Sequence, residues 1–178
     1  MGVRIINPMP SAFLLFALPD APATEALGAA LARTFPGAQV GAVVHLRGEL
    51  GSGKTTCARS LLHALGITST VRSPTYTLVD TYSVAELTCV HVDLYRIQTL
   101  NEVDELGLRD LTGPGYLMLI EWPEKGGGAV PRADLALQLT YAGEARAALL
   151  AGGSEVGARW LSELAIDSSL KPYVSNLT

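Results

Sequence analysis

Gly48-Glu49-Leu50-Gly51-Ser52-Gly53-Lys54-Thr55-Thr56 is the stretch that decides the fold, because it matches the pattern G-x-x-x-x-G-K-[ST]. An apolar run, 40–46, precedes it, and apolar residues follow it with helical spacing at Ala58, Leu61, Leu62 and Leu65. A strand, a glycine-rich loop and a helix in this order form a P-loop, whose backbone N–H groups and helix N-terminus bind phosphate. The sequence therefore predicts a nucleotide site at 48–56.

The residue types of this motif suit a nucleoside triphosphate and its metal. Glycines let the backbone wrap around phosphates without a Cβ atom in the way. Lys54 adds a mobile charge for the β- and γ-phosphates, and Thr55 offers a hydroxyl to Mg²⁺. We therefore expect ATP and Mg²⁺ as cofactors, with phosphate contacts from Glu49, Leu50, Gly51, Ser52, Gly53, Lys54, Thr55 and Thr56.

Length and composition predict one globular domain over residues 1–178. The chain is 48% hydrophobic and 17% charged, which is typical of an α/β protein with a buried sheet. Its net charge of −4 argues against direct RNA binding, because a protein that binds RNA phosphates normally carries a basic face. Cys57 and Cys89 fall in apolar segments and are expected to be buried thiols of a reducing compartment.

The N-terminal region imitates a weak signal peptide, with Arg4, the apolar run 13–18 and the sequence 21–23. We reject this interpretation, because the run is short and Pro19 and Asp20 interrupt it before the cleavage site. No apolar stretch approaches the length of a membrane span. We therefore expect a cytoplasmic protein.

Hydrophobic periodicity predicts an alternation of strands and helices. Strands are expected at 12–18, 40–46, 78–83, 87–93, 116–121, 135–141 and 145–150. Helices are expected from Asp20 to 34, from 54 to 65, over 100–111 and over 155–164. The predicted fold is a P-loop NTPase-like α/β domain with a mostly parallel central sheet, antiparallel hairpins and flanking helices.

Three features refine this topology. The short connections at 84–86 and 142–144 predict antiparallel hairpins, and the run 12–18 is expected near the sheet edge. The unbroken apolar run 116–121 predicts a central parallel strand buried on both faces. The tail from Asp167 is expected to be ordered only if it packs against the domain.

Two carboxylates are candidates for positioning the metal and the attacking water. Glu121 ends the most hydrophobic strand, and Asp93 ends another apolar strand. Ligand sites of α/β sheets lie at the carboxyl ends of parallel strands, so both acids are expected to face the P-loop. An ordinary strand-end acid that caps a helix or pairs with an arginine remains an alternative for each.

Three further positions are less specific. The polar loop 73–76 follows the P-loop helix, where nucleotide switches keep a hydroxyl that senses the γ-phosphate, although a plain turn would have the same composition. His91 is expected to be a packed or hydrogen-bonded strand residue, because no His/Cys spacing suggests zinc. Trp122 is compatible with the core or with a place beside the site.

These motifs together resemble one protein family. The sequence resembles the bacterial TsaE (YjeE) family, the ATPase of tRNA threonylcarbamoyladenosine biosynthesis, through GELGSGKTT (48–56), SPTYTLVDTY (73–82), HVDLYRI (91–97), LGLRDL (106–111) and IEWPEKG (120–126). The likeness covers about residues 12–150, so 1–11 and the C-terminal helix and tail, 151–178, lie outside it. Its specificity comes from five motifs in the same order and spacing.

The resemblance implies a slow Mg²⁺-dependent ATPase that assists the TsaB and TsaD proteins in tRNA modification, with tRNA contacted indirectly if at all. By position, Lys54 and Thr55 take the phosphate and metal roles, Glu121 is the metal-binding acid, Asp93 is a second acid near the metal or water, and Thr75 is the switch hydroxyl. In this family the first helix and the last hairpin help to hold the nucleoside. Here those places offer Ala21 and Gly143, so base contacts are expected from backbone or from Thr24.

Two other functions are compatible with the P-loop. A small-molecule kinase would transfer the phosphoryl group to a hydroxyl, but such enzymes usually need several clamping arginines, and the ten arginines of this chain are scattered singly. A nucleotide-gated binding module would use ATP mainly to change shape. ADP release, measured alone, with acceptors and with partner proteins, separates the three.

Overall fold

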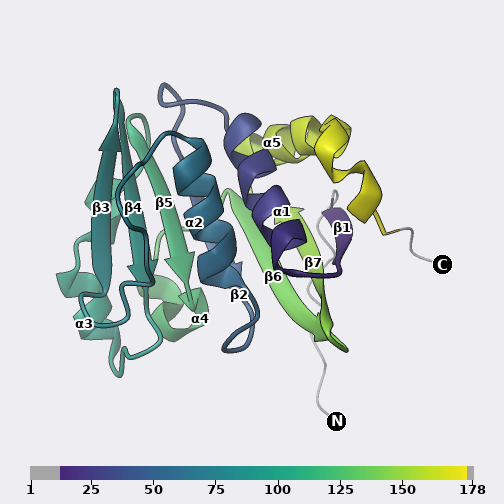
Figure 1. Cartoon of the computed structure of the whole chain (residues 1–178). Coiled ribbons are helices and arrows are strands. Elements are labelled where there is room, and N and C mark those ends of the chain that lie inside the picture. Colours follow the sequence, from purple (N-terminus) through teal and green to yellow (C-terminus); the bar gives the residue numbers. More distant parts are fainter. Residues whose placement is uncertain (1–12, 176–178) are drawn as a thin grey trace, which may run out of the picture.

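Four mutually parallel strands form the centre of a seven-stranded sheet (Figure 1). We describe residues 13–175 of a computed structural model. In sheet order the parallel strands are β6 (Leu135–Ala142), β2 (Ala42–Arg47), β5 (Tyr116–Glu121) and β4 (Leu87–Asp93). All six residues of β5 except Tyr116 are buried, which confirms the predicted central strand.

Antiparallel strands complete both edges of the sheet. β3 (Val79–Val84) pairs with β4 as the predicted hairpin, and β7 (Ala145–Gly152) pairs with β6 as the other. β1 (Phe13–Leu18) pairs with β7 and forms the outer edge, also as predicted. The predicted start of this strand at Ala12, and the N-terminal segment 1–11, lie outside the described residues.

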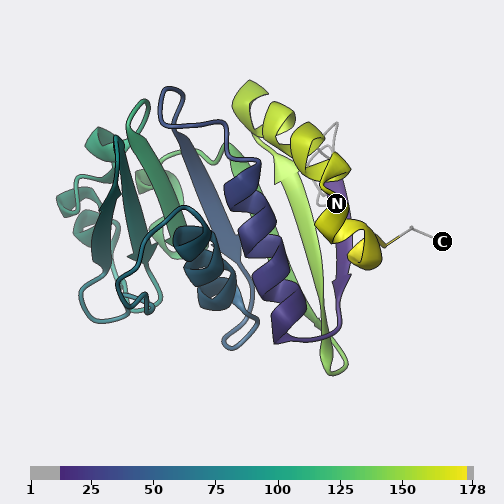
Figure 2. The ribbon, with the colours of Figure 1, turned by 45° about the horizontal axis from the view of Figure 1, so that its top comes forward.

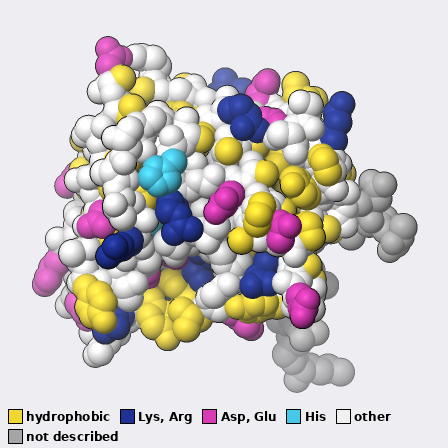
Figure 3. Space-filling model, viewed as in Figure 1, with side chains coloured by type: hydrophobic (Ala, Val, Ile, Leu, Met, Phe, Trp, Pro, Cys, Tyr) yellow, Lys and Arg dark blue, Asp and Glu magenta, His cyan; other side chains and the backbone are white. Residues whose placement is uncertain are grey.

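Helices α1 (Ala21–Arg33) and α2 (Lys54–Ala64) lie side by side on one face of the sheet (Figure 1). Asp20 caps α1 by accepting a hydrogen bond from the backbone N–H of Ala23, which confirms the predicted start. Close contact of the helices requires Gly28, because a Cβ atom there would lie 2.4 Å from the carbonyl oxygen of Cys57. On this face Figure 3 shows acidic and basic side chains interspersed.

The opposite face is covered by short elements: α3 (Leu100–Glu105), the 3-10 helix η1 (Leu108–Leu111), α4 (Pro123–Gly126) and the 3-10 helix η2 (Gly127–Ala129). The prediction of one helix over 100–111 was therefore wrong. Gly107 adopts a left-handed conformation with φ of 60°, which ends α3 and rotates the chain. Leu108 is buried as a result, whereas Leu106 and Leu111 are only half-buried.

Two strands begin one or two residues later than predicted, each after a left-handed residue. Gly41, with φ of 71°, precedes β2, and a Cβ atom there would lie 1.9 Å from the carbonyl oxygen of Gly113. Leu78, with φ of 65°, precedes β3. Neither conformation belongs to a strand, so the apolar runs begin before the regular pairing does.

The C-terminal region packs against the domain (Figure 2). The tail from Asp167 was expected to be ordered only under this condition. α5 (Glu155–Ile166) buries Trp160 against α1, and the 3-10 helix η3 (Ser168–Tyr173) buries Leu170. Arg33 and Asp167 form an ion pair of 3.1 Å between α1 and this region. Both cysteines are buried and free, as predicted. Within 13–175, no helix has the length and apolar character needed to cross a membrane.

Candidate nucleotide site

The carboxyl ends of three adjacent parallel strands form the floor of the site. Asp93 and Glu121 are directly paired across β4 and β5, and Leu46 of β2 pairs with Glu121 from the other side. Both carboxylates are buried, with 3% and 2% exposure. The predicted location of the two acids at this end of the sheet, beside the loop after β2, is therefore confirmed.

Residues 48–53 join β2 to α2 through a loop with three left-handed glycines. Gly48, Gly51 and Gly53 all have positive φ, and Gly53 occupies the N-cap position of α2 with φ of 106°. No side chain of the described part of the chain caps this helix, so its first N–H groups stay available to an anion, where the helix dipole also favours negative charge. An L-residue with a side chain would be strained at Gly53.

Lys54 lies across the inside of the loop. Its Nζ donates hydrogen bonds to the carbonyl oxygens of Gly48 and Glu49 at 2.7 and 2.9 Å, and it stacks 4.0 Å from the ring centroid of Trp122. Burial lowers the pKa of the Lys54 ammonium, against the opposing effect of the Glu121 and Asp93 carboxylates. The lysine is thus held by neutral carbonyl groups and an aromatic face, without a direct ion pair.

Glu121 connects the helix to the sheet through two polar side chains. The Thr55 hydroxyl lies 2.9 and 3.0 Å from its two carboxylate oxygens, and His91 Nε2 lies 2.9 Å from Oε1. Since a carboxylate only accepts, the hydroxyl and the imidazole are the donors. His91 is fully buried, and its Nδ1 has no hydrogen-bond partner among the described residues. His91 is hydrogen-bonded as expected, and its role is to orient Glu121.

Asp93 is the centre of a second group. Its Oδ2 accepts hydrogen bonds from the hydroxyls of Ser73 and Thr75, the latter at 3.1 Å, and its Oδ1 accepts from the backbone N–H of Tyr95 at 2.8 Å. The two hydroxyls also lie 2.8 Å apart. The loop 73–76 is therefore tied to the end of β4, and Thr75 lies where a switch hydroxyl was expected.

One cavity of about 380 Å³ unites these groups. It is lined by Leu50, Gly51, Gly53, Lys54, Thr55, Thr56, Ser73, Thr75, Asp93, Tyr95, Arg96, Glu121 and Trp122. Two predicted phosphate contacts have side chains outside it. Glu49 lines an adjoining hollow, and Ser52 is fully buried, with no partner for its hydroxyl within residues 13–175, so each could contact phosphate only through its backbone.

The predicted nucleoside region is a smaller hollow of about 140 Å³ on the other side of the loop. Ala21 and Thr24 line it, together with Glu144 and Arg146 from the last hairpin. The Thr24 hydroxyl already donates to the carbonyl oxygen of Asp20 at 3.4 Å. Gly143 is not among the lining residues. The first helix and the last hairpin do meet here, but Glu144 and Arg146 are the polar groups that the sequence analysis missed.

Sequence analysis also missed four features: the side chains of Ser73 and Arg96 in the lining of the larger cavity, the hydrogen bond of His91 to Glu121 beneath it, and the contact of Trp122 with Lys54. Arg96 carried a usable signal, because it follows Asp93 by three residues in a motif already singled out. The other contacts join segments far apart in the chain. Arg96 and Arg146, scattered in sequence, lie on either side of one loop, so sequence spacing is a poor guide to clamping arginines.

The oxygen atoms that line the cavity are of the kind that bind Mg²⁺. Thr55, Glu121 and Asp93 offer hard oxygen atoms, which Mg²⁺ prefers. Within residues 13–175, no group of three or more His, Cys, Asp or Glu side chains could hold a metal by itself. Mg²⁺ usually binds through one or two carboxylates plus substrate phosphates and water.

Comparison with known proteins identifies the family. Residues 18–148 match the family described as threonylcarbamoyl adenosine biosynthesis protein TsaE. The TsaE protein of Haemophilus influenzae is 40% identical over 120 residues, which cover 67% of this chain and 76% of that protein. The TsaE protein of Synechocystis is 39% identical over 114 residues, 62% of this chain and 70% of that protein.

A solved structure confirms the fold. The crystal structure of Bacillus subtilis YdiB superposes with a TM-score of 0.70 at 26% sequence identity, covering 86% of this chain and 95% of that one. The sheet with its P-loop, the paired strand-end acids and the family match over 18–148 agree with one another. The chain belongs to the TsaE family of threonylcarbamoyl adenosine biosynthesis proteins.

Proposed function

We propose that this protein binds ATP with Mg²⁺ and hydrolyses it slowly, as an accessory ATPase in threonylcarbamoyladenosine modification of tRNA. The observation that carries the proposal is the hydrogen bond between the Thr55 hydroxyl and the Glu121 carboxylate at the start of the P-loop helix. In P-loop proteins this hydroxyl and a strand-end acid together hold Mg²⁺. When bound, Mg²⁺ would neutralise charge on the phosphates.

The side chains of the cavity support distinct roles in this reaction. Lys54 would exchange its two carbonyl acceptors for oxygens of the terminal phosphates, which gain more from a full positive charge. Asp93, with Ser73 and Thr75 bonded to it, lies where it could orient a water molecule or a second metal ligand. Release of either hydroxyl from Asp93 would free the loop 73–76 to respond to the γ-phosphate.

The accessory role rests on the family and on charge. The family's name places it in tRNA threonylcarbamoyladenosine biosynthesis, and the net charge of −4 suits docking onto tRNA-binding proteins better than direct contact with tRNA. TsaB and TsaD are the proposed partners. ATP would order the loop 73–76 and the segment 106–111, and hydrolysis would release them, so that partners distinguish the two states.

The test is to mix the protein with TsaB and TsaD, with and without ATP, and to follow complex formation, ADP release and multiple-turnover tRNA modification. We expect the partners and ATP to strengthen each other's binding, because linkage is reciprocal when both favour one conformation. Lys54→Ala is the matched control, since it should fold and yet fail to support turnover. If the protein neither joins the complex nor changes turnover, and a small hydroxyl compound is phosphorylated instead, it is a kinase.

A further inference from the structure

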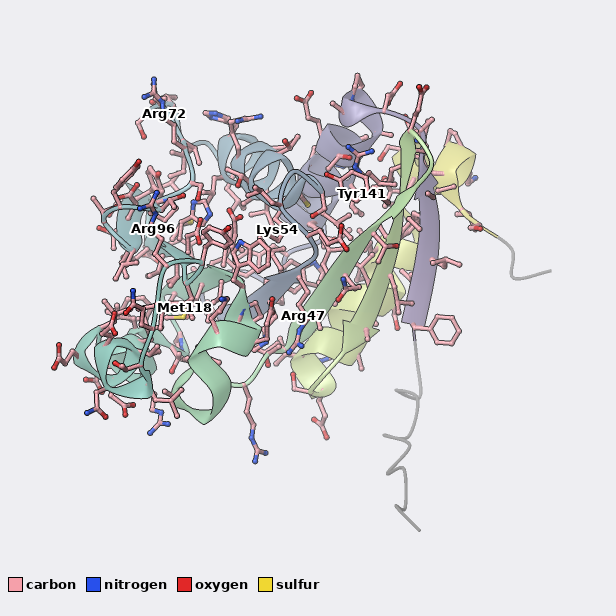
Figure 4. All side chains as sticks on the ribbon, turned by 90° about the horizontal axis from the view of Figure 1, so that it is seen from below. Arg47, Lys54, Arg72, Arg96, Met118 and Tyr141 are labelled. Atoms are coloured by element: carbon pink, nitrogen blue, oxygen red, sulfur yellow. The ribbon has the colours of Figure 1, made fainter. Side chains whose placement is uncertain are left out.

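Arg96 lies on a hydrogen-bonded turn and lines the cavity. The turn follows β4, where Leu94 N–H donates to the carbonyl oxygen of Glu121 at 3.1 Å and Tyr95 N–H donates to Asp93 at 2.8 Å. Arg96 lines the same cavity as Lys54, and Figure 4, which faces the carboxyl ends of the parallel strands, shows both residues on this side. The two residues before Arg96 thus anchor the turn to both acids of the site.

The Arg96 guanidinium has no ionic partner in the part of the chain that the structure describes. No hydrogen bond or ion pair of this group occurs within 13–175. It stacks instead on Tyr76, with Cζ 4.4 Å from the ring centroid, and that tyrosine is 84% exposed. A cation–π contact at an exposed site is weak, so a stronger acceptor would readily displace Tyr76.

The position of Arg96 indicates which part of a nucleotide it would contact. Gly51, Gly53 and Thr56 line both the large cavity and the small hollow on the other side of the loop. A nucleotide whose base lies in the small hollow would cross these residues and place its last phosphate in the large cavity. Arg96 lies in that cavity with the Ser73, Thr75 and Asp93 group, and does not line the small hollow.

We propose that Arg96 binds the terminal phosphate of ATP, and that Tyr76 holds its side chain when this phosphate is absent. A guanidinium presents a planar fork of N–H donors that matches two phosphate oxygens, which the single ammonium of Lys54 does not. Movement of Arg96 from Tyr76 would also free the Tyr76 ring, so that the loop 73–76 can take up the ordered conformation proposed for the ATP state; Arg96 would thus report the γ-phosphate to the proposed switch. This inference rests on ATP being the ligand of the cavity.

The experiment compares Arg96→Ala, Arg96→Lys and wild type by calorimetric titration with a non-hydrolysable ATP analogue and with ADP, each with Mg²⁺. We expect Arg96→Ala to lose about tenfold or more in affinity for the ATP analogue, as for a charge-assisted hydrogen bond, and less than about twofold for ADP. Arg96→Lys should retain only part of the analogue affinity, because it keeps the charge without the fork.

Two further variants control the result. Arg72→Ala removes an exposed arginine that does not line the cavity (Figure 4), and both affinities should stay within about twofold of wild type. Tyr76→Ala removes only the stacking surface and should not weaken binding of the analogue. Hydrogen exchange of the loop 73–76 with the analogue bound should change in wild type and not in Arg96→Ala.

The outcomes separate this inference from the proposed function. If wild type binds neither nucleotide, ATP is not the ligand and both proposals fall. Suppose that wild type binds ATP but that Arg96→Ala loses affinity for the analogue and for ADP by the same factor, or loses no affinity for either. Arg96 then does not bind the terminal phosphate. If Tyr76→Ala weakens the analogue as much as Arg96→Ala does, the tyrosine is part of the binding site and not a resting position.

Discussion

The hydroxyl of Thr55 lies within 3.0 Å of both carboxylate oxygens of Glu121, although 66 positions separate these residues in the chain. The contact joins the first turn of α2 to the last residue of β5. Because His91 holds the same carboxylate from the sheet side at 2.9 Å, Glu121 has one orientation before any ligand arrives. Binding to a site that is already ordered costs less free energy, because its side chains need not be ordered when the ligand binds.

We expect Lys54→Ala to abolish Mg²⁺-dependent ATP binding and turnover while the protein stays folded. Among residues 13–175, the ammonium contacts only backbone carbonyls and the face of Trp122, so its loss breaks no buried ion pair there. Nucleotide titration together with a thermal unfolding curve is the measurement. A folded Lys54→Ala protein with unchanged affinity and activity would contradict the P-loop assignment.

Glu121→Gln should slow hydrolysis about a hundredfold, since loss of one well-placed electrostatic group costs about 3 kcal/mol in the transition state. The amide keeps the size of the side chain and an acceptor for the Thr55 hydroxyl, so the fold should change little. Single-turnover ADP formation is the measurement. A loss below about threefold would show that Glu121 is an ordinary strand-end acid.

Asp93→Asn should also slow hydrolysis more than it reduces stability, with an additional effect on the loop 73–76. Its Oδ2 accepts from both Ser73 and Thr75, and an amide nitrogen in that place could not accept from either. We expect faster hydrogen exchange in this loop together with a slower rate of ADP formation. Unchanged exchange and an unchanged rate would leave Asp93 without the role assigned to it.

We expect part of the stability to depend on pH through the carboxyl group of Asp167. Hydrogen bonds from Arg33, and then from Ser169, lower the pKa of Asp167 from 3.8 to about 2. A lowered pKa in the folded state stabilises the protein above pH 3.8, and this contribution is lost as the pH falls to about 2. The free energy of unfolding of Asp167→Asn, measured with urea, should therefore lack this loss. At low pH the wild-type protein and Asp167→Asn should have the same free energy of unfolding.

The two buried thiols should be inert in the native protein. Burial raises the pKa of Cys57 to about 12 and that of Cys89 to about 11, so the reactive thiolate is scarce at neutral pH. A colorimetric thiol reagent at neutral pH should label neither cysteine until denaturant is added, and both afterwards. Rapid labelling of the native protein would show that α2 or β4 opens readily, since these elements carry the two residues.

The sequence by itself determined the P-loop, the central strands and the two strand-end acids. These features follow from local rules: Gly53 is required for a left-handed turn, apolar runs such as 116–121 form buried strands, and an acid that ends a parallel strand lies at the ligand side of the sheet. Asp93 and Glu121 therefore had to be neighbours once β4 and β5 paired in register. Local rules also found the Asp20 cap of α1.

Only the tertiary structure decided which side chains meet at the cavity. His91 with Glu121, Ser73 with Asp93 and Trp122 with Lys54 are contacts that depend on strand order and side-chain direction. The same holds for the arginines, because Arg96 lies on the turn after β4 and Arg146 lies in β7, and these two segments meet at the loop only after the sheet assembles. Periodicity records which face of an element is buried, but not what lies opposite that face, so such pairs cannot be predicted from one sequence.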